Sequence, residues 1–407
     1  MWTICGLLLL ASAINYMDRQ TLAGASVRIT REFHLNQAGY GEIEAVFGYA
    51  FAAGSLVFGW MADRFGVRAL YAVVLLLWSV AGIATGFVHT PHQLLVCRAL
   101  LGFFEAGHWP CAIRTTRLLL DPSRRSFGNG LLQSGASLGA ILTPLVLRGL
   151  MGPGEGGWRV PFLVVGVAGL GWLIPWLLLV RDRDLRHRDE ATPAAASGNS
   201  NAGGPSLWDL LGSRHLWIVF GLIACINTTW QVSRAWLMKF LQEGRGFGEN
   251  DALLLNSAWF AAADVGCILA GAVVMRLALR GVPVHRARVW VFGGCAMLCA
   301  LMGLLPWLGR GPVLLAVLGL SAAGSLGVFP IYHALTQDLP ERFQGRITGM
   351  AGVAGWLAPA QAQHAFGVLA DRTGSFDLGL ILAGFLPTFA LLLLIVCWRP
   401  VTPRGGR

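Results

Sequence analysis

Two adjacent charged residues, Asp18 and Arg19, lie in the middle of the first apolar segment of the chain. A charge near the centre of a bilayer costs roughly 2.5–3.5 kcal/mol even on the lenient insertion scale, so such residues usually face a protein interior or a water-filled path. Arg98 and Glu105 repeat this combination of a base and an acid in a later apolar segment. Two such sites are typical of a path for protons and anions through a membrane.

Arg98 and Glu105 lie seven positions apart, about two turns of a helix, so both side chains point to the same face. Burial favours the neutral form of a carboxyl group, whereas a neighbouring guanidinium favours the ionised form. Such opposed effects suit a carboxyl that loads and releases a proton. Asp18 and Arg19 differ by about 100° around their helix, so one addresses a cavity and the other a neighbouring helix. A permanently ionised structural pair, for example Asp18 with Arg98, is the alternative interpretation.

The elements that position these residues are long apolar helices. Of the 407 residues, 55% are hydrophobic and only 13% are charged, and the mean hydropathy is +0.60. Soluble domains carry about 25% charged residues, so the composition excludes an ordinary soluble protein. A helix needs about 20 mostly apolar residues to span a bilayer. We expect an all-α membrane protein with twelve transmembrane helices, near residues 2–27, 40–62, 69–89, 92–117, 127–150, 158–180, 214–240, 252–275, 288–308, 312–336, 346–369 and 378–398.

A polar segment divides these spans into six and six. Residues 181–213 begin with alternating charges and continue into a stretch rich in Ala, Ser, Asn, Gly and Pro. Such a segment cannot bury apolar surface and is typical of a flexible linker. We expect an N-terminal six-helix bundle over residues 1–180, a cytoplasmic linker over 181–213 and a C-terminal six-helix bundle over 214–407.

The basic residues indicate the orientation of the chain. When successive loops are assigned to alternate sides, about 20 of the 31 Lys and Arg residues fall on one side and about 8 on the other. The positive-inside rule makes the richer side cytoplasmic and places both termini there. The net charge of +10 therefore indicates topology rather than nucleic-acid binding. The eight cysteines form no C-x-x-C pair and the chain has no Walker A loop, so we expect no metal and no cofactor.

Further polar residues lie inside other apolar spans. Gln133 is an uncharged hydrogen-bonding group in the fifth span and suits a ligand rich in hydroxyl groups. Tyr16 and Tyr49 can offer their hydroxyls to the same kind of ligand. Trp230 and Arg234 lie in the seventh span. We expect Arg234 to belong to an anion-binding cavity or an outer gate, with snorkelling to the outer interface as the alternative.

Four motifs give the chain a resemblance to a known family. The loop after the second span reads Gly59-Trp60-Met61-Ala62-Asp63-Arg64-Phe65-Gly66-Val67-Arg68, which resembles the Gly-x-x-x-Asp-Arg-x-Gly-x-Arg signature of the major facilitator superfamily. The motifs over residues 15–19, 98–110 and 133–139 resemble the anion:cation symporter branch, which takes up sugar acids such as hexuronates and galactonate with protons. Duplicated halves with a site between them are the plan of many such transporters.

The resemblance implies roles for individual residues. Arg19 meets the substrate carboxylate and Asp18 carries a proton. Asp63, Arg64 and Arg68 form a charge clamp that holds the outward-open state, and Gly66 permits the bend; a solvated loop that only sets the topology is the alternative. The expected substrate-binding residues are Tyr16, Arg19, Tyr49, Arg98, Gln133, Trp230 and Arg234, and the expected proton-coupling residues are Asp18 and Glu105.

These observations predict a secondary transporter rather than an enzyme. We expect a monomeric, multi-pass protein of a bacterial inner membrane that imports an organic anion, such as a hexuronate or aldonate, with protons by alternating access. Its expected partners are the anion, protons and the lipid bilayer, and not nucleic acid. Three alternatives stay open: an organic-anion or drug antiporter or exporter of the same fold, a non-transporting membrane sensor or scaffold, and a membrane enzyme such as a transferase, for which the sequence offers no nucleophile or metal constellation.

Overall fold

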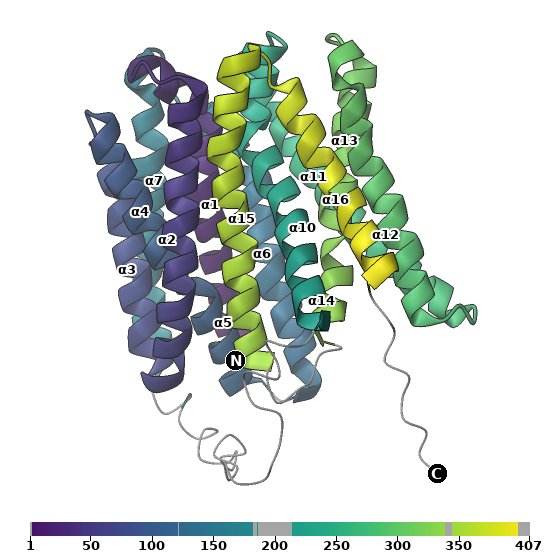
Figure 1. The fold of residues 1–407 in the computed structure, drawn as a ribbon. Helices are drawn as coiled ribbons and strands as arrows, with labels where there is room; N and C mark the ends of the chain where they lie inside the picture. The colour runs from purple at the N-terminus through teal and green to yellow at the C-terminus, as the bar shows by residue number, and fades with distance from the viewer. Residues whose placement is uncertain (1, 121, 182–184, 186–213, 338–343, 398–407) are drawn as a thin grey trace, which may run out of the picture. The chain divides into compact units, whose positions relative to one another are not determined.

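The computed structural model describes residues 2–120, 122–181, 185, 214–337 and 344–397, and the regular elements within these ranges are all helices (Figure 1). The helices before the linker are α1 (Trp2–Glu32), α2 (Gln37–Arg64), α3 (Val67–Thr85), α4 (Pro91–Glu105), α5 (His108–Leu119), α6 (Pro122–Leu150), η1 (Glu155–Trp158) and α7 (Arg159–Leu179). Those after it are α10 (Arg214–Lys239), η2 (Phe240–Gly244), α11 (Glu249–Leu279), α12 (Val284–Ala300), η3 (Leu301–Trp307), α13 (Pro312–Gly327), α14 (Phe329–Gln337), α15 (Gln344–Thr373) and α16 (Asp377–Cys397).

Nine of the described helical segments are long and apolar enough to cross a membrane. The predicted spans over 2–27, 92–117 and 346–369 are not among the nine, although helices cover all three. The first contains the Asp18-Arg19 pair, and the second breaks between Glu105 and His108 into α4 and α5. Asp18 and Arg19 in the first and the break in the second make these two segments less apolar, and both contain residues of the predicted site.

Contacts divide the described chain into two compact units. The first contains the helices up to α7, together with Arg234–Phe260 and Pro359–Phe376. It therefore includes the end of α10, the start of α11 and the end of α15. The second contains the rest of α10, Ala261–Ala358 and α16. The bundle boundaries at residues 180 and 214 stay a prediction.

Close helix contacts build the first unit, where α1 packs along α6, α2 along α4, and α3 against both α4 and α7 (Figure 1). Gly139 of α6 faces the carbonyl oxygen of Ala13 in α1, and a methyl group at this position would clash with it. Gly102 of α4 faces the carbonyl oxygen of Phe47 in α2 in the same way. Small residues let membrane helices approach closely, and here they bring the charged residues of α1, α2 and α4 together.

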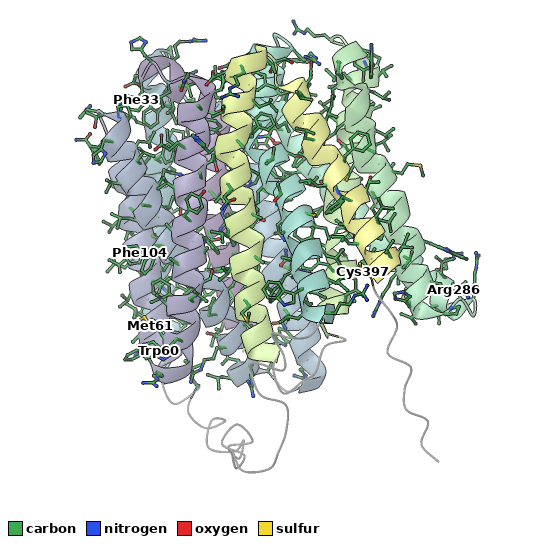
Figure 2. The ribbon with its side chains drawn as sticks, in the orientation of Figure 1. Phe33, Trp60, Met61, Phe104, Arg286 and Cys397 are labelled. Carbon is green, nitrogen blue, oxygen red and sulfur yellow. The ribbon has the colours of Figure 1, made fainter. Side chains whose placement is uncertain are left out.

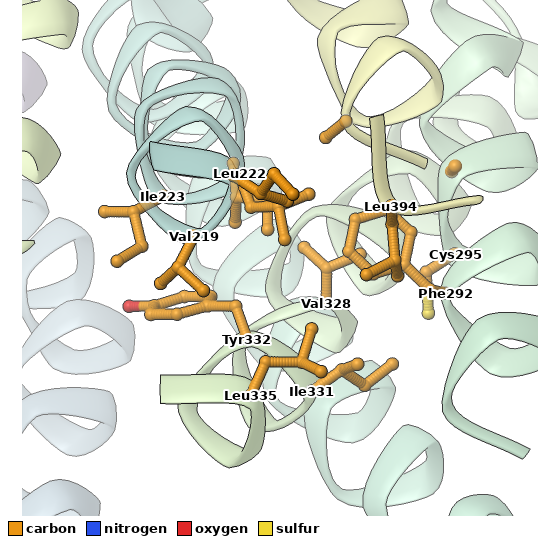
Figure 3. Packing of buried hydrophobic residues seen from close by; sticks show 14 of the residues in the cluster. Val219, Leu222, Ile223, Phe292, Cys295, Val328, Ile331, Tyr332, Leu335 and Leu394 are labelled. Carbon is orange, nitrogen blue, oxygen red and sulfur yellow. The ribbon is translucent and has the colours of Figure 1, made fainter. Parts of the chain in front are cut away.

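The second unit has its own apolar core. Figure 3 shows Val219, Leu222 and Ile223 of α10 packed with side chains of α12, α14 and α16. Leu222 and Phe292 are fully buried in this cluster. Packing of this kind fixes how α10 is rotated about its own axis within the second unit.

Candidate functional site

The candidate site is a group of charged side chains buried inside the first unit. All of them are at most 2% exposed. They come from four helices and comprise three acids and three bases: Asp18 and Arg19 of α1, Glu44 of α2, Arg98 and Glu105 of α4, and Arg234 of α10.

Arg19 and Glu105 form the shortest ion pair of this group. Oε2 of Glu105 accepts hydrogen bonds from Nη2 of Arg19 at 2.9 Å and from Nε at 3.3 Å. Nη2 of Arg19 also donates to Oδ1 of Asn15 at 3.2 Å. The guanidinium carbon lies 5.1 Å from the ring centroid of Tyr16 and 5.1 Å from that of Phe51, so Tyr16 contributes its aromatic face here. The aromatic rings and the hydrogen bonds together fix the guanidinium in place.

Asp18 points away from Arg19, as their 100° separation predicts. Its Oδ1 would lie 3.0 Å from a Cβ atom placed on Gly82, so the carboxyl faces α3. Neither carboxyl oxygen has a hydrogen-bond partner among the described residues. Among the described residues Arg98 forms an ion pair with Glu44 and none with Asp18, which the sequence left open as its partner.

Arg98 is fully buried and makes no hydrogen bond through its side chain within the described part of the chain. Its guanidinium carbon lies 4.3 Å from the ring centroid of Phe47. Nη2 lies 3.9 Å from Oε2 of Glu44, which is within reach of an ion pair but too long for a hydrogen bond. Arg98 is therefore a charged donor in the interior whose donor capacity is unused.

Glu44 is the member of the group that the sequence analysis missed. Its Oε2 lies 3.5 Å from Nη2 of Arg234, and its Oε1 accepts a hydrogen bond from the Tyr40 hydroxyl at 3.3 Å. The available signal was an acid inside the predicted span 40–62, since ionisable residues in spans usually have a function. Arg234 is only 1% exposed, so it does not snorkel.

The remaining predicted binding residues lie outside this group. Tyr49 is 41% exposed and follows Glu44 by five positions, on a different face of α2. Gln133 is exposed on α6. Trp230 belongs to the second unit, where it is buried with its ring centroid 6.1 Å from that of Phe329. The structure thus brings together Arg19, Arg98, Glu105 and Arg234, and their roles stay predictions.

The predicted gating motif lies at the end of α2 that carries Trp60 and Met61 (Figure 2). The guanidinium of Arg64 lies 4.7 Å from the Trp60 ring centroid, and Nη2 of Arg68 donates to the carbonyl oxygen of Leu177 at 2.9 Å. The side chain of Asp63 lies outside the described residues. Gly66 has φ −60° and ψ 120°, a conformation that any residue adopts, and its part in gating stays a prediction.

At the opposite end of α2, the side chain of Asp371 in α15 contacts the start of the helix, and the sequence analysis missed this contact. Oδ1 of Asp371 accepts from the backbone N–H of Gln37 at 2.9 Å, and Oδ2 accepts from that of Ala38 at 2.8 Å. The residues around this acid, Gly367-x-x-x-Asp371-Arg372-x-Gly374, repeat the pattern of Gly59-x-x-x-Asp63-Arg64-x-Gly66. This repeated pattern was the sequence signal that could have identified Asp371.

Further polar contacts join the end of α10 to α1, α2 and α15 in this unit. The Tyr40 hydroxyl donates to the carbonyl oxygen of Ala235 at 2.9 Å, and Nε1 of Trp236 donates to Oε1 of Gln363 at 2.6 Å. The buried Lys239 donates to Oγ1 of Thr30 at 3.0 Å and pairs with a Glu243 oxygen at 3.1 Å. This end of the unit is therefore closed by hydrogen bonds rather than by apolar contacts alone.

Comparisons with known proteins agree with this arrangement. Residues 8–362 match the family described as the Major Facilitator Superfamily. The chain is 31% identical to the "Probable sulfoacetate transporter SauU" of Cupriavidus necator, over 94% of this chain and 90% of that one. It is 26% identical to the hexuronate transporter of Escherichia coli K12, over 98% and 93% of the two chains.

Solved structures of other transporters share the fold of this chain. The inward open structure of the xylose transporter XylE from E. coli aligns with a TM-score of 0.78 at 14% identity, over 99% of this chain and 97% of that one. The protein is thus a multi-pass membrane transporter and not an enzyme, and its relatives match the predicted anion:cation symporter branch. The chain belongs to the major facilitator superfamily.

Proposed function

We propose that the protein imports a small organic acid anion together with protons by alternating access. The observation that carries this proposal is the buried group of three guanidiniums and three carboxyls in the first unit. Ionisable groups in a membrane interior are costly and are typical of substrate paths and proton relays. Relatives named for hexuronate, L-galactonate and sulfoacetate transport support an acid as the substrate.

Arg19 and Arg98 select the acid group, because a guanidinium presents paired donors that match the oxygens of a carboxylate or sulfonate. Sugar acids are the first candidate substrates, with Tyr16, Tyr49 and Gln133 contacting their hydroxyls. Small sulfonates are the second candidate, favoured by the 31% identity to the sulfoacetate transporter against 26% to the hexuronate transporter.

Proton coupling follows from competition for Arg19. When the substrate acid group binds Arg19, it displaces Glu105, and an ionised carboxylate without its partner is costly in the interior. Glu105 then takes a proton. Asp18, whose carboxyl has no hydrogen-bond partner among the described residues, is the second carrier. A monoanion with one proton moves no net charge, and a second proton adds about 2.3 kcal/mol per 100 mV of membrane potential.

The same proposal places both termini in the cytoplasm of a bacterial cell, with the protein acting as a monomer in the inner membrane. The excess of Lys and Arg on one side of the predicted spans supports this orientation. The turn between α2 and α3, with Arg64 and Arg68, is then the cytoplasmic gate. The contact of Asp371 with α2 lies on the outer side.

Uptake into proteoliposomes under an inward proton gradient tests the proposal. Labelled galacturonate, galactonate and sulfoacetate are compared with xylose as an uncharged control. We expect accumulation of at least one acid, loss of accumulation when the gradient is collapsed, and no transport of xylose. Outward transport of a cation or a neutral drug, with no movement of any acid, would contradict the assignment.

A further inference from the structure

Glu44 holds a position between two arginines that come from different helices. Its Oε2 lies 3.5 Å from Nη2 of Arg234 on α10 and 3.9 Å from Nη2 of Arg98 on α4. The side chain is 1% exposed, and the Tyr40 hydroxyl lies 3.3 Å from its Oε1 but shares its single proton with the Ala235 carbonyl oxygen at 2.9 Å. One buried carboxyl thus faces two buried positive charges.

This contact balances charge but leaves the donors of Arg98 open. Both distances lie at or beyond the limit of a hydrogen bond, and Nε, Nη1 and Nη2 of Arg98 have no hydrogen-bond partner in the part of the chain that the structure describes. Buried donors are almost always hydrogen-bonded, and each exception calls for an explanation. A guanidinium with a full set of open donors fits a group with two or three acidic oxygens.

We infer that Glu44 is an internal counter-ion that the acid group of the substrate replaces. In the empty site the ionised Glu44 balances Arg98 and Arg234. When Glu44 takes a proton, the two guanidiniums face no ionised carboxyl, and the acid group of an incoming anion binds between them. Release of the anion returns the charge to Glu44, which gives up its proton. This inference rests on the proposed function and adds Glu44 to the residues that carry protons.

The formal charges of the group agree with this exchange. Asp18, Glu44 and Glu105 are three acids and Arg19, Arg98 and Arg234 are three bases, so the fully ionised group is neutral. Protonation of Glu44 alone gives the whole group a net charge of +1, which one acid group of the substrate neutralises.

Other ionisable groups on the surrounding helices are close enough to influence the charge of Glu44. In this structure Glu105 pairs with Arg19, and Asp18 faces α3. Lys239 lies over the ring of Tyr40, 5.3 Å from its centroid. α15 packs against Gly41 of α2 through Gln363 and His364. The groups to be considered are therefore Tyr40 on α2, Arg98 and Glu105 on α4, Asp18 and Arg19 on α1, Arg234 and Lys239 on α10, and His364 on α15.

Proton uptake during anion binding tests the inference. The full-length protein in weakly buffered detergent solution is titrated with galacturonate, sulfoacetate and inorganic sulfate, and a pH indicator reports the protons taken up. For each linked proton, the apparent Kd rises about tenfold per pH unit where the group titrates. We expect Glu44→Gln to bind with one proton fewer and with a pH slope reduced by one.

Two further variants control this experiment. Glu42→Gln removes an exposed acid two positions away on the same helix and is expected to leave the proton count unchanged. Glu44→Asp keeps an acid at the site and is expected to restore proton uptake, so a fold defect in Glu44→Gln is distinguishable from loss of the proton site. Undiminished proton uptake in a folded Glu44→Gln variant, or anion binding by the wild type without protons, overturns the inference.

The test is separable from that of the proposed function. If liposomes take up no organic acid but sulfate binds with a proton that Glu44→Gln loses, the counter-ion role stands and the substrate assignment fails. If an organic acid accumulates with protons and Glu44→Gln couples like the wild type, the transport assignment stands and the role of Glu44 fails.

Discussion

Replacing Glu105 tests the buried ion pair at the centre of the site. Oε2 of Glu105 accepts two hydrogen bonds from Arg19, at 2.9 and 3.3 Å, and Arg19 also donates to Asn15 at 3.2 Å. Glutamine has nearly the same size and keeps an acceptor oxygen at this place, but it removes the charge and the titratable proton. Alanine removes the acceptor as well.

The two substitutions should differ in their effect on stability. Glu105→Gln keeps an oxygen that accepts from the charged Arg19, a hydrogen bond that contributes about 1.5–3 kcal/mol, but it leaves the guanidinium without an ionised partner, so it should lower the free energy of unfolding by about 1–3 kcal/mol. Removal of one partner of a buried ion pair costs about 3–5 kcal/mol, because the other charge remains buried. Glu105→Ala should therefore be the less stable variant.

Thermal unfolding in detergent and two transport assays check this prediction. We expect the unfolding temperature to fall from the wild type to Glu105→Gln and further to Glu105→Ala. In liposomes, Glu105→Gln should lose proton-driven accumulation but keep exchange of labelled for unlabelled substrate, because exchange needs no net proton transfer. An unchanged unfolding temperature in Glu105→Ala would refute the role of Glu105 in holding Arg19, and accumulation by Glu105→Gln would refute its proton role.

Three further predictions concern other parts of the first unit. Gly139→Val should abolish folded expression, measured by size-exclusion chromatography, because its side chain would meet the Ala13 carbonyl oxygen, whereas Gly130→Val, in open space, should not. Asp371→Asn should weaken the contact with α2 by about 1–2 kcal/mol, seen as a 5–30-fold rise in thiol labelling of Gln37→Cys. The hydrogen bond from Arg159 lowers the pKa of Glu32, which lies beyond the predicted span 2–27. The wild type should therefore have a higher free energy of unfolding than Glu32→Gln. Unfolding measured across a pH series should show this difference in full above pH ~4.5 and show it vanish as the pH falls through the lowered pKa.

The sequence predicted the charged residues of the site better than their partners. Periodicity within one helix placed Arg98 and Glu105 on the same face and separated Asp18 from Arg19. The pairing of Arg19 with Glu105 depends on how α1 and α4 are rotated within the unit, where α4 packs closely on α2 at Gly102 and α1 on α6 at Gly139. A pattern within one segment carries no information on such rotations.

The two missed acids have different explanations. Glu44 lies in an otherwise apolar span, and only its neighbours Arg98 and Arg234, more than fifty positions away, distinguish it from the exposed Glu42. Asp371 lies in a pattern that matches the recognised motif around Asp63, but its role appears only when the start of α2 lies beside the end of α15. The roles of Glu44 and Asp371 could be identified only from their tertiary contacts.

The contact of Asp371 with α2 has a consequence for how this end of the protein tolerates sequence change. Both donors are backbone N–H groups at the first two positions of α2, and the third N–H donates to the side chain of Asn36. Ordinary substitutions of Gln37 or Ala38 leave the donors in place. Proline at position 37 is the exception, since the first position of a helix accepts it without a break while the N–H is lost. Apart from proline, the α2 side of this contact is thus free to vary, and selection to keep the contact acts mainly on residue 371.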